Sequence, residues 1–94
     1  MRHPQLAVLV KSRNFVVKVQ VQTAGRKGKT VTTLDGLPKN ELFLKELLKI
    51  FKTSFGSGGS VLLDKKDGAL ELQGDHRDKV CKILEGNEIK FVLK

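Results

Sequence analysis

Apolar and polar residues alternate along residues 15–22, and this period of two predicts a strand with one buried face. The apolar positions of that strand are Phe15, Val17, Val19 and Val21. Residues 23–29 interrupt the alternation with two glycines and three cations, and residues 30–34 resume β-branched character. The pattern therefore predicts a hairpin of two strands with a basic tip.

A helical period follows a breaker at residues 35–38, Asp-Gly-Leu-Pro. Apolar residues then recur at helical spacing, at Leu44, Leu47, Leu48, Phe51 and Phe55. Lysines follow the same spacing on another side of the helix, at Lys45, Lys49 and Lys52. Because Gly56 is the residue type that commonly ends a helix, we expect a helix with a core face and a basic stripe that ends there.

The second half of the chain predicts two more strands, a helix and a final strand. A glycine-rich stretch at residues 56–59 leads into an apolar run at 60–63, a turn at 64–68 and an alternating segment at 69–73. Asp75 is placed to cap a helix, and Asp78 suits its positive end. The apolar face of that helix is Val80, Ile83 and Leu84, the helix ends at Gly86, and residues 89–93 form the last strand.

The element order is thus ββαββαβ, which indicates the α+β class. We expect a two-layer sandwich in which both helices pack on one face of a mostly antiparallel sheet and the other face stays open. Residues 15–94 form a single domain in this interpretation. Residues 1–14 are either an N-terminal arm or an extra edge strand through residues 6–10.

Length and composition limit the possible size and class of the protein, and they agree with the predicted fold. A chain of 94 residues supports one modest core, and no apolar run approaches the ~18 residues of a membrane span. Residues 5–10 are too short for a signal-peptide core and no cleavage pattern follows them, so we expect no export signal. The single cysteine, Cys81, cannot form an internal disulfide, which fits a cytoplasmic location.

The formal net charge of +8 is unevenly distributed. Residues 1–34 contain seven Lys or Arg and no Asp or Glu, whereas residues 35–94 contain eleven cations and ten acids. Like charges gathered in one region repel each other. Binding to a polyanion relieves this repulsion and is also favoured by the release of counterions. Nucleic acid is the leading partner class, and a merely solubilising surface is the alternative.

Several motif-like stretches have simpler interpretations. The turn at residues 56–59 lacks the Lys-Ser/Thr pair of a nucleotide-binding loop and follows a helix, so it is a helix stop. His3, His76 and Cys81 are too scattered for a metal site, and Gly58-Gly59 continues with Ser60 instead of the Gln of peptidyl-tRNA hydrolysing factors. We expect no catalytic residue, no metal and no cofactor. Phe51 and Phe55 suit the core, whereas Phe43 lies off the apolar stripe.

Three segments resemble the eukaryotic-type translation initiation factor 1 family in its short, bacterial-like prokaryotic form. They are residues 22–29 (Gln-Thr-Ala-Gly-Arg-Lys-Gly-Lys), 55–61 (Phe-Gly-Ser-Gly-Gly-Ser-Val) and 71–80 (Glu-Leu-Gln-Gly-Asp-His-Arg-Asp-Lys-Val). Each segment alone is a weak signal, but their order and spacing together are specific. Many members have a cysteine where this chain has Ser57, so no thiol or metal chemistry is expected in that turn.

The resemblance implies a monomeric initiation factor that binds the small ribosomal subunit near the peptidyl-tRNA site. There it would help to reject wrong start codons or wrong initiator tRNA by occupancy, beside other initiation factors. The implied contacts with ribosomal RNA are Arg26, Lys27 and Lys29 at the hairpin tip, then Lys45, Lys49 and Lys52. Apart from the resemblance, Arg77 is a further candidate RNA contact in residues 74–78, a stretch that helix capping explains. A general RNA-binding or RNA-annealing protein without a dedicated ribosomal site is the competing hypothesis.

Overall fold

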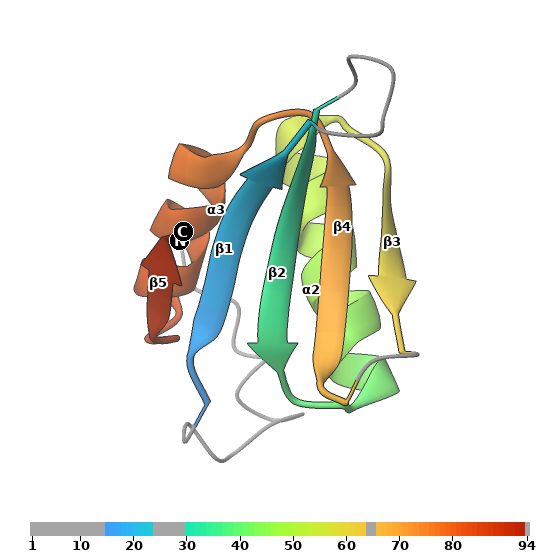
Figure 1. Ribbon diagram of the computed structural model, residues 1–94, viewed down its shortest axis with the longest axis vertical. Coiled ribbons are helices and arrows are strands. Elements are labelled where there is room, and N and C mark those ends of the chain that lie inside the picture. Colours follow the sequence, from blue (N-terminus) through green and yellow to red (C-terminus); the bar gives the residue numbers. More distant parts are fainter. Residues whose placement is uncertain (1–14, 24–29, 64–65, 94) are drawn as a thin grey trace.

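The computed structural model describes residues 15–23, 30–63 and 66–93 (Figure 1). Its elements are β1 (Val17–Gln22), β2 (Val31–Leu37), α2 (Glu41–Phe55), β3 (Gly59–Leu62), β4 (Gly68–Gln73), α3 (Arg77–Gly86) and β5 (Phe91–Leu93). The predicted order ββαββαβ and the α+β class are confirmed. The predicted arm or edge strand in residues 1–14 lies outside the described residues. Within the described part, no helix is long and apolar enough to cross a membrane.

The five strands form one sheet in the order β3-β4-β2-β1-β5. The pairs β1–β2, β2–β4 and β3–β4 are antiparallel, and only β1–β5 is parallel. The prediction of a mostly antiparallel sheet is therefore confirmed. The chain reaches β5 only after crossing the sheet through α3, so the last strand enters beside the first one and runs in the same direction (Figure 1).

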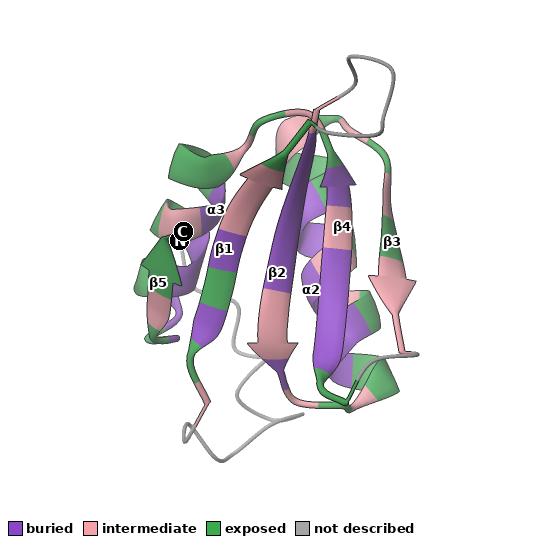
Figure 2. Cartoon of the chain, in the orientation of Figure 1, coloured by how far each residue is buried: buried purple, intermediate pink, exposed green. Residues whose placement is uncertain are grey.

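Both helices cover the same face of the sheet, as predicted. Helix α2 lies across β3 and β4, and α3 lies across β1 and β5. Side chains of both helices and of the facing strands form a single core cluster, including Val19, Leu34, Leu72, Phe51 and Leu84. Lys18 and Gln22 of β1 alternate onto the opposite face, where they are exposed (Figure 2). That face is not fully open as predicted, because Val31 and Thr33 of β2, which pair with Gln22 and Gln20, are buried as well. The fold is a two-layer sandwich.

Helix α2 buries a wider face than the predicted stripe. Leu44, Leu47 and Phe51 are fully buried as expected, but Leu48 and Phe55 are only partly buried. Ile50 is buried as well, and so is Phe43, which the spacing had left off the apolar face. The ring of Phe43 meets Phe15 edge to face with 6.3 Å between centroids, so Phe43 belongs to the core and offers no exposed stacking surface.

Strand β2 continues through the predicted breaker. The strand reaches Leu37, but its register against β4 shifts between Leu34 and Leu37, which marks a bulge. Gly36 has φ +79°, and a Cβ at this position would lie 2.6 Å from the carbonyl oxygen of Val16. Only glycine fits that close approach, so Asp-Gly bends the strand without ending it, and Pro38 follows where the strand stops.

The two ends of α2 follow local chemistry. Asn40 caps its start, because its side-chain oxygen accepts a hydrogen bond from the N–H of Phe43 at 3.2 Å. At the other end Gly56 adopts φ 65° and its N–H donates to the carbonyl oxygen of Lys52 at 2.9 Å. The predicted end of the helix at Gly56 is confirmed. Because α2 ends there, β3 begins at the same end of the domain.

Candidate nucleic-acid interface

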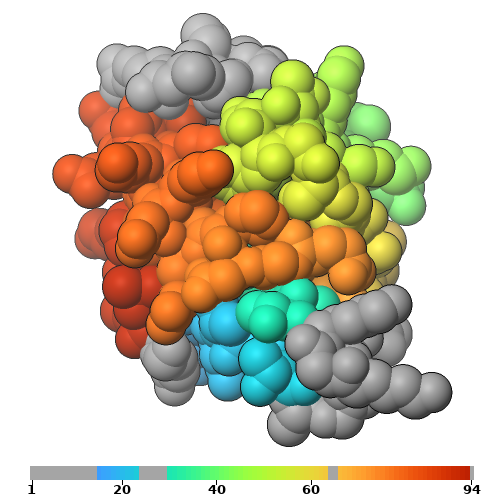
Figure 3. All heavy atoms as spheres, turned by 90° about the horizontal axis from the view of Figure 1, so that it is seen from above, coloured from blue at the N-terminus to red at the C-terminus, as the bar shows by residue number. Residues whose placement is uncertain are grey.

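The described residues of the three segments that carry the family resemblance meet at one end of the molecule. Gln22 pairs with Val31 where β1 ends and β2 begins, and Gly59 pairs with Leu72 where β3 begins and β4 ends. Seen from this end, the loop after β4 runs between the end of α2 and the ends of β1 and β2 (Figure 3). We call this surface the hairpin end. It comprises residues 22–23, 30–31, 55–58 and 74–77.

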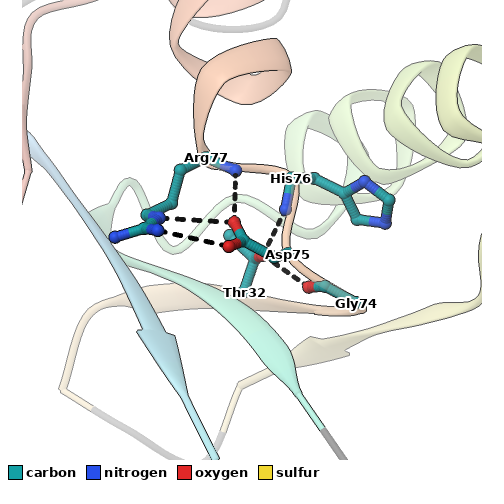
Figure 4. A network of polar contacts seen from close by, with 5 residues as sticks. All are labelled: Thr32, Gly74, Asp75, His76 and Arg77. Carbon is teal, nitrogen blue, oxygen red and sulfur yellow. Dashed lines mark hydrogen bonds and ion pairs between the residues drawn. The ribbon is translucent and has the colours of Figure 1, made fainter.

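Thr32 ties the loop between β4 and α3 to the base of the hairpin. This residue is fully buried. Its Oγ1 donates to the carbonyl oxygen of Gly74 at 2.7 Å and accepts from the N–H of His76 at 2.9 Å (Figure 4). The N–H of Gly74 in turn donates to the carbonyl oxygen of Thr30 at 2.7 Å. The loop is thus held by hydrogen bonds that converge on the first residues of β2.

Aromatic stacking ties the same loop to α2. The rings of Phe51 and Phe55 stack with 5.6 Å between centroids, and the rings of Phe55 and His76 stack at 4.9 Å. The Nζ of Lys79 lies 6.0 Å from the centroid of the Phe55 ring. His76 is also fixed through its Nε2, which lies 2.7 Å from the carbonyl oxygen of Gln73. A column of rings therefore runs from the core to the surface of the hairpin end.

Asp75 does not cap α3 as predicted. The residue at the cap position is His76, and its side chain makes no capping hydrogen bond. The Asp75 carboxylate accepts instead from the backbone N–H and the Nε of Arg77, both at 3.3 Å, and from Nη2 at 3.2 Å (Figure 4). The predicted role of Asp78 agrees with the structure, since it is the acidic residue of the first helical turn.

Arg77 also lowers the pKa of its partner. Hydrogen bonds from the Arg77 side chain hold the pKa of the Asp75 carboxyl below its ordinary value, because they stabilise the ionised form. Both side chains are 48% exposed. The predicted RNA contact Arg77 is therefore a surface guanidinium with one edge already bound to a carboxylate.

The predicted basic stripe on α2 is present. Lys45, Lys49 and Lys52 are exposed, and Lys45 forms a loose ion pair with Glu41 at 3.9 Å. Since α2 runs toward Gly56, the stripe leads toward the hairpin end, and Lys52 stands in the last turn of the helix. The structure thus brings Lys52 and Arg77 to the same end of the domain. The predicted tip residues Arg26, Lys27 and Lys29 lie outside the described residues, between Thr23 and Thr30.

Sequence reasoning missed the contacts by which Thr32, His76 and Lys79 hold this surface together. For Thr32 a signal existed, because a hydroxyl on the buried side of a strand needs a polar partner. The other two residues depend on the packing of α3 against the end of α2, which no local pattern shows.

Metal ligands and the thiol of Cys81 are the remaining candidates for site chemistry among the described residues. Among them, no group of three His, Cys, Asp or Glu side chains is arranged to hold a metal ion. Burial raises the pKa of the Cys81 thiol, and the nearby Asp78 and Glu85 raise it further, so the less reactive protonated form is favoured. Cys81 is half-buried against the core, as a small apolar residue would be.

Comparison with known proteins identifies the family. The sequence model of the family described as Translation initiation factor SUI1 matches residues 14–90. The uncharacterized protein YciH of Escherichia coli is 38% identical over 90 residues, which cover 96% of this chain and 80% of that relative. The protein translation factor SUI1 homolog of Sulfolobus acidocaldarius is 40% identical over 76 residues, covering 81% and 71%. The SUI1 homolog of Pyrococcus horikoshii is 40% identical over 68 residues, covering 72% and 64%.

The chain belongs to the translation initiation factor SUI1 family. This membership confirms the resemblance to eukaryotic-type initiation factor 1 in its short prokaryotic form. The family is a family of translation factors and not a class of enzymes, and it supports a role in translation initiation.

Proposed function

We propose that this protein is a cytoplasmic, monomeric initiation factor that binds the small ribosomal subunit near the peptidyl-tRNA site. It contributes to discrimination of the start codon or initiator tRNA by occupying space, without bond chemistry. The observation that carries this proposal is the meeting of three family segments at the hairpin end, where an exposed basic stripe also arrives.

Charge supports RNA as the partner. The lysines of α2 project from a rigid helix, and residues 24–29 between Thr23 and Thr30 add three more cations. Such cations position a protein on phosphates without reading the base sequence, so specificity must come from the shape of the folded RNA. Cations that are held on a folded domain match the fixed shape of ribosomal RNA better than they match a flexible single-stranded RNA.

Two triple variants with equal charge test the proposed surface. The first changes Lys45, Lys49 and Lys52 of the stripe to Gln. The second changes Lys39, Lys66 and Lys90, which are exposed and lie at the opposite ends of the strands, to Gln. Both variants lower the formal net charge from +8 to +5. Binding to purified small subunits is measured by co-sedimentation across a salt series.

We expect the stripe variant to lose affinity and to reduce the slope of log K against log salt by about 2–3, since each phosphate contact contributes ~0.9. The control variant should retain most of the affinity and most of the salt dependence. Equal losses in the two variants would mean that net charge alone drives binding. A wild-type protein displaced from small subunits by an equal mass of unrelated long RNA would favour the general RNA-binding alternative and contradict a dedicated ribosomal site.

A further inference from the structure

The Asp75–Arg77 pair lies at the surface, yet the loop that presents it is anchored in the core. Thr32 holds the backbone on both sides of Asp75 through Gly74 and His76. The ring of His76 is fixed between its bond to Gln73 and its stack on Phe55. These contacts fix the loop on both sides of Asp75, so the backbone that carries Asp75 and Arg77 is ordered before any partner arrives.

Folding accounts for Asp75, whose carboxylate accepts the N–H of Arg77 at the positive end of α3, but it gives a weak reason for the charge of Arg77. Exposed ion pairs contribute little to stability, because solvent screens them and two side chains lose freedom. Arg77 is also the first residue of α3, where the positive end of the helix dipole disfavours a cation. A residue placed against the helix dipole and then oriented by a neighbouring carboxylate is better explained by a ligand.

The carboxylate uses only one edge of the guanidinium. Asp75 accepts from Nε and from one N–H of Nη2, which together form the side edge of Arg77. Of the five N–H donors, the remaining three lie on Nη1 and Nη2 at the end of the side chain, and in Figure 4 this end points away from Asp75. Two parallel donors at the end of a guanidinium match two oxygens of a phosphate.

We propose that the outer edge of Arg77 binds a backbone phosphate of ribosomal RNA and that Asp75 is its positioning residue. This inference rests on the proposed function and assigns one contact within it. The carboxylate holds the guanidinium in the fork orientation, and the anchored loop holds the carboxylate. Arg77 then meets the phosphate without losing rotamer freedom on binding, which is the advantage of a preorganised contact.

The variant Asp75→Asn distinguishes a positioning role of Asp75 from an effect of net charge, because the two explanations predict opposite changes in RNA binding. Asp75→Asn raises the formal net charge from +8 to +9, so charge alone predicts tighter binding to RNA. The positioning role predicts weaker binding, because asparagine replaces two charged acceptors by one neutral acceptor. Asp78→Asn is the matched control, since this exposed residue in the first turn of α3 changes the charge equally without contacting Arg77 through a described hydrogen bond or ion pair.

Affinity for purified small subunits is measured at fixed salt for the wild type, Asp75→Asn, Asp78→Asn, Arg77→Gln and the double variant Asp75→Asn/Arg77→Gln. We expect Asp75→Asn to weaken binding about fivefold, the upper range for an exposed charged contact, and Asp78→Asn to bind at least as tightly as the wild type. In the Arg77→Gln background the Asp75 change should no longer weaken binding, because Asp75 acts through Arg77. Circular dichroism spectra and melting temperatures of all variants verify that they are folded.

Different results would contradict different parts of this account. If the wild type binds and Asp75→Asn binds as tightly as Asp78→Asn, Asp75 does not position Arg77, and if Arg77→Gln binds as tightly as the wild type, the Arg77 phosphate contact is wrong; in both cases the proposed function stands. If Asp75→Asn weakens binding equally with and without Arg77, Asp75 does not act through Arg77 and the positioning role is wrong. A wild-type protein that does not bind small subunits at all contradicts the proposed function, and this inference with it.

Discussion

The ring of Phe55 stacks on the ring of His76 with 4.9 Å between centroids and 16° between planes. One residue ends α2 and the other immediately precedes α3, so this contact joins the two helices at the hairpin end. Phe51 continues the stack into the core. The orientation of the loop that carries Asp75 and Arg77 therefore depends on the interior packing of the domain.

We predict that Phe55→Leu lowers the free energy of unfolding by about 1–3 kcal/mol, because two aromatic pairs worth ~0.5–1.5 kcal/mol each are replaced by aliphatic contact. Urea denaturation measures the change. Phe91→Leu is the control, since Phe91 is also half-buried but has no ring partner among the residues that the structure describes. Equal destabilisation of the two variants would mean that the stack adds nothing beyond buried area.

Thr32 is the second residue that anchors the loop. We expect its hydroxyl group to contribute more to the stability of the domain than the packing of its side chain does. Thr32→Val keeps the volume but removes a donor and an acceptor at 2.7 and 2.9 Å, leaving Gly74 and His76 without this partner. We expect a loss of about 1–3 kcal/mol in the free energy of unfolding. Thr33→Val should cost much less, because the Thr33 hydroxyl donates to Gln20 only at 3.4 Å. A larger effect at Thr33 would contradict the role assigned to Thr32.

The two glycines before and at the start of β3 should respond differently to alanine. A Cβ at Gly59 would lie 2.8 Å from the carbonyl oxygen of Glu71 and 2.9 Å from side-chain carbons of Leu48 and Leu72. Gly59→Ala therefore forces a shift of the strand edge and should cost about 1–3 kcal/mol in stability. At Gly58 the nearest atom is Gln73 Cγ at 3.6 Å, an ordinary contact, so Gly58→Ala should be nearly neutral in the same thermal or urea melts.

Asp75 should titrate below an ordinary aspartate, because Arg77 stabilises its ionised form. The carboxylate then contributes stability at every pH above its unfolded-state pKa of about 3.9, and that contribution disappears as pH falls through the lower folded-state pKa. NMR titration of the Asp75 side chain measures the value directly. Arg77→Gln should return the Asp75 pKa toward the ordinary value, and an unchanged titration in that variant would show that the pair does not persist in solution.

Much of the fold could be predicted from periodicity because each element obeys its own local rule. The alternation in β1, the helical spacing of Leu44, Leu47 and Phe51, and the stop at Gly56 all appear in the structure. Where packing overrides local preference, the sequence left Phe43 undecided and wrongly ended the second strand before Asp-Gly. Phe43 is buried because α2 lies on a broad sheet and meets Phe15, and β2 runs through Asp-Gly because Gly36 can bulge.

The candidate site was harder to predict because its contacts join distant parts of the chain. The cations Lys52 and Arg77 could be singled out by residue type, but not their arrival at the same end of the domain. Asp75 was expected to cap α3, whereas its carboxylate is occupied by the side chain of Arg77. The parallel pairing of β5 with β1 likewise follows from where α3 packs, which no local pattern contains.

The central claim is that this SUI1-family protein binds the small ribosomal subunit through the hairpin end. Co-sedimentation of purified small subunits across a salt series tests it most directly, with the wild type and with Arg26, Lys27 and Lys29 all changed to Ala. We expect the wild type to co-sediment and the triple variant to lose affinity. The slope of log K against log salt should also decrease in the triple variant, by the contribution of about three charges. Indistinguishable binding of the two proteins would contradict docking through this end, and no binding by either would contradict the ribosomal assignment itself.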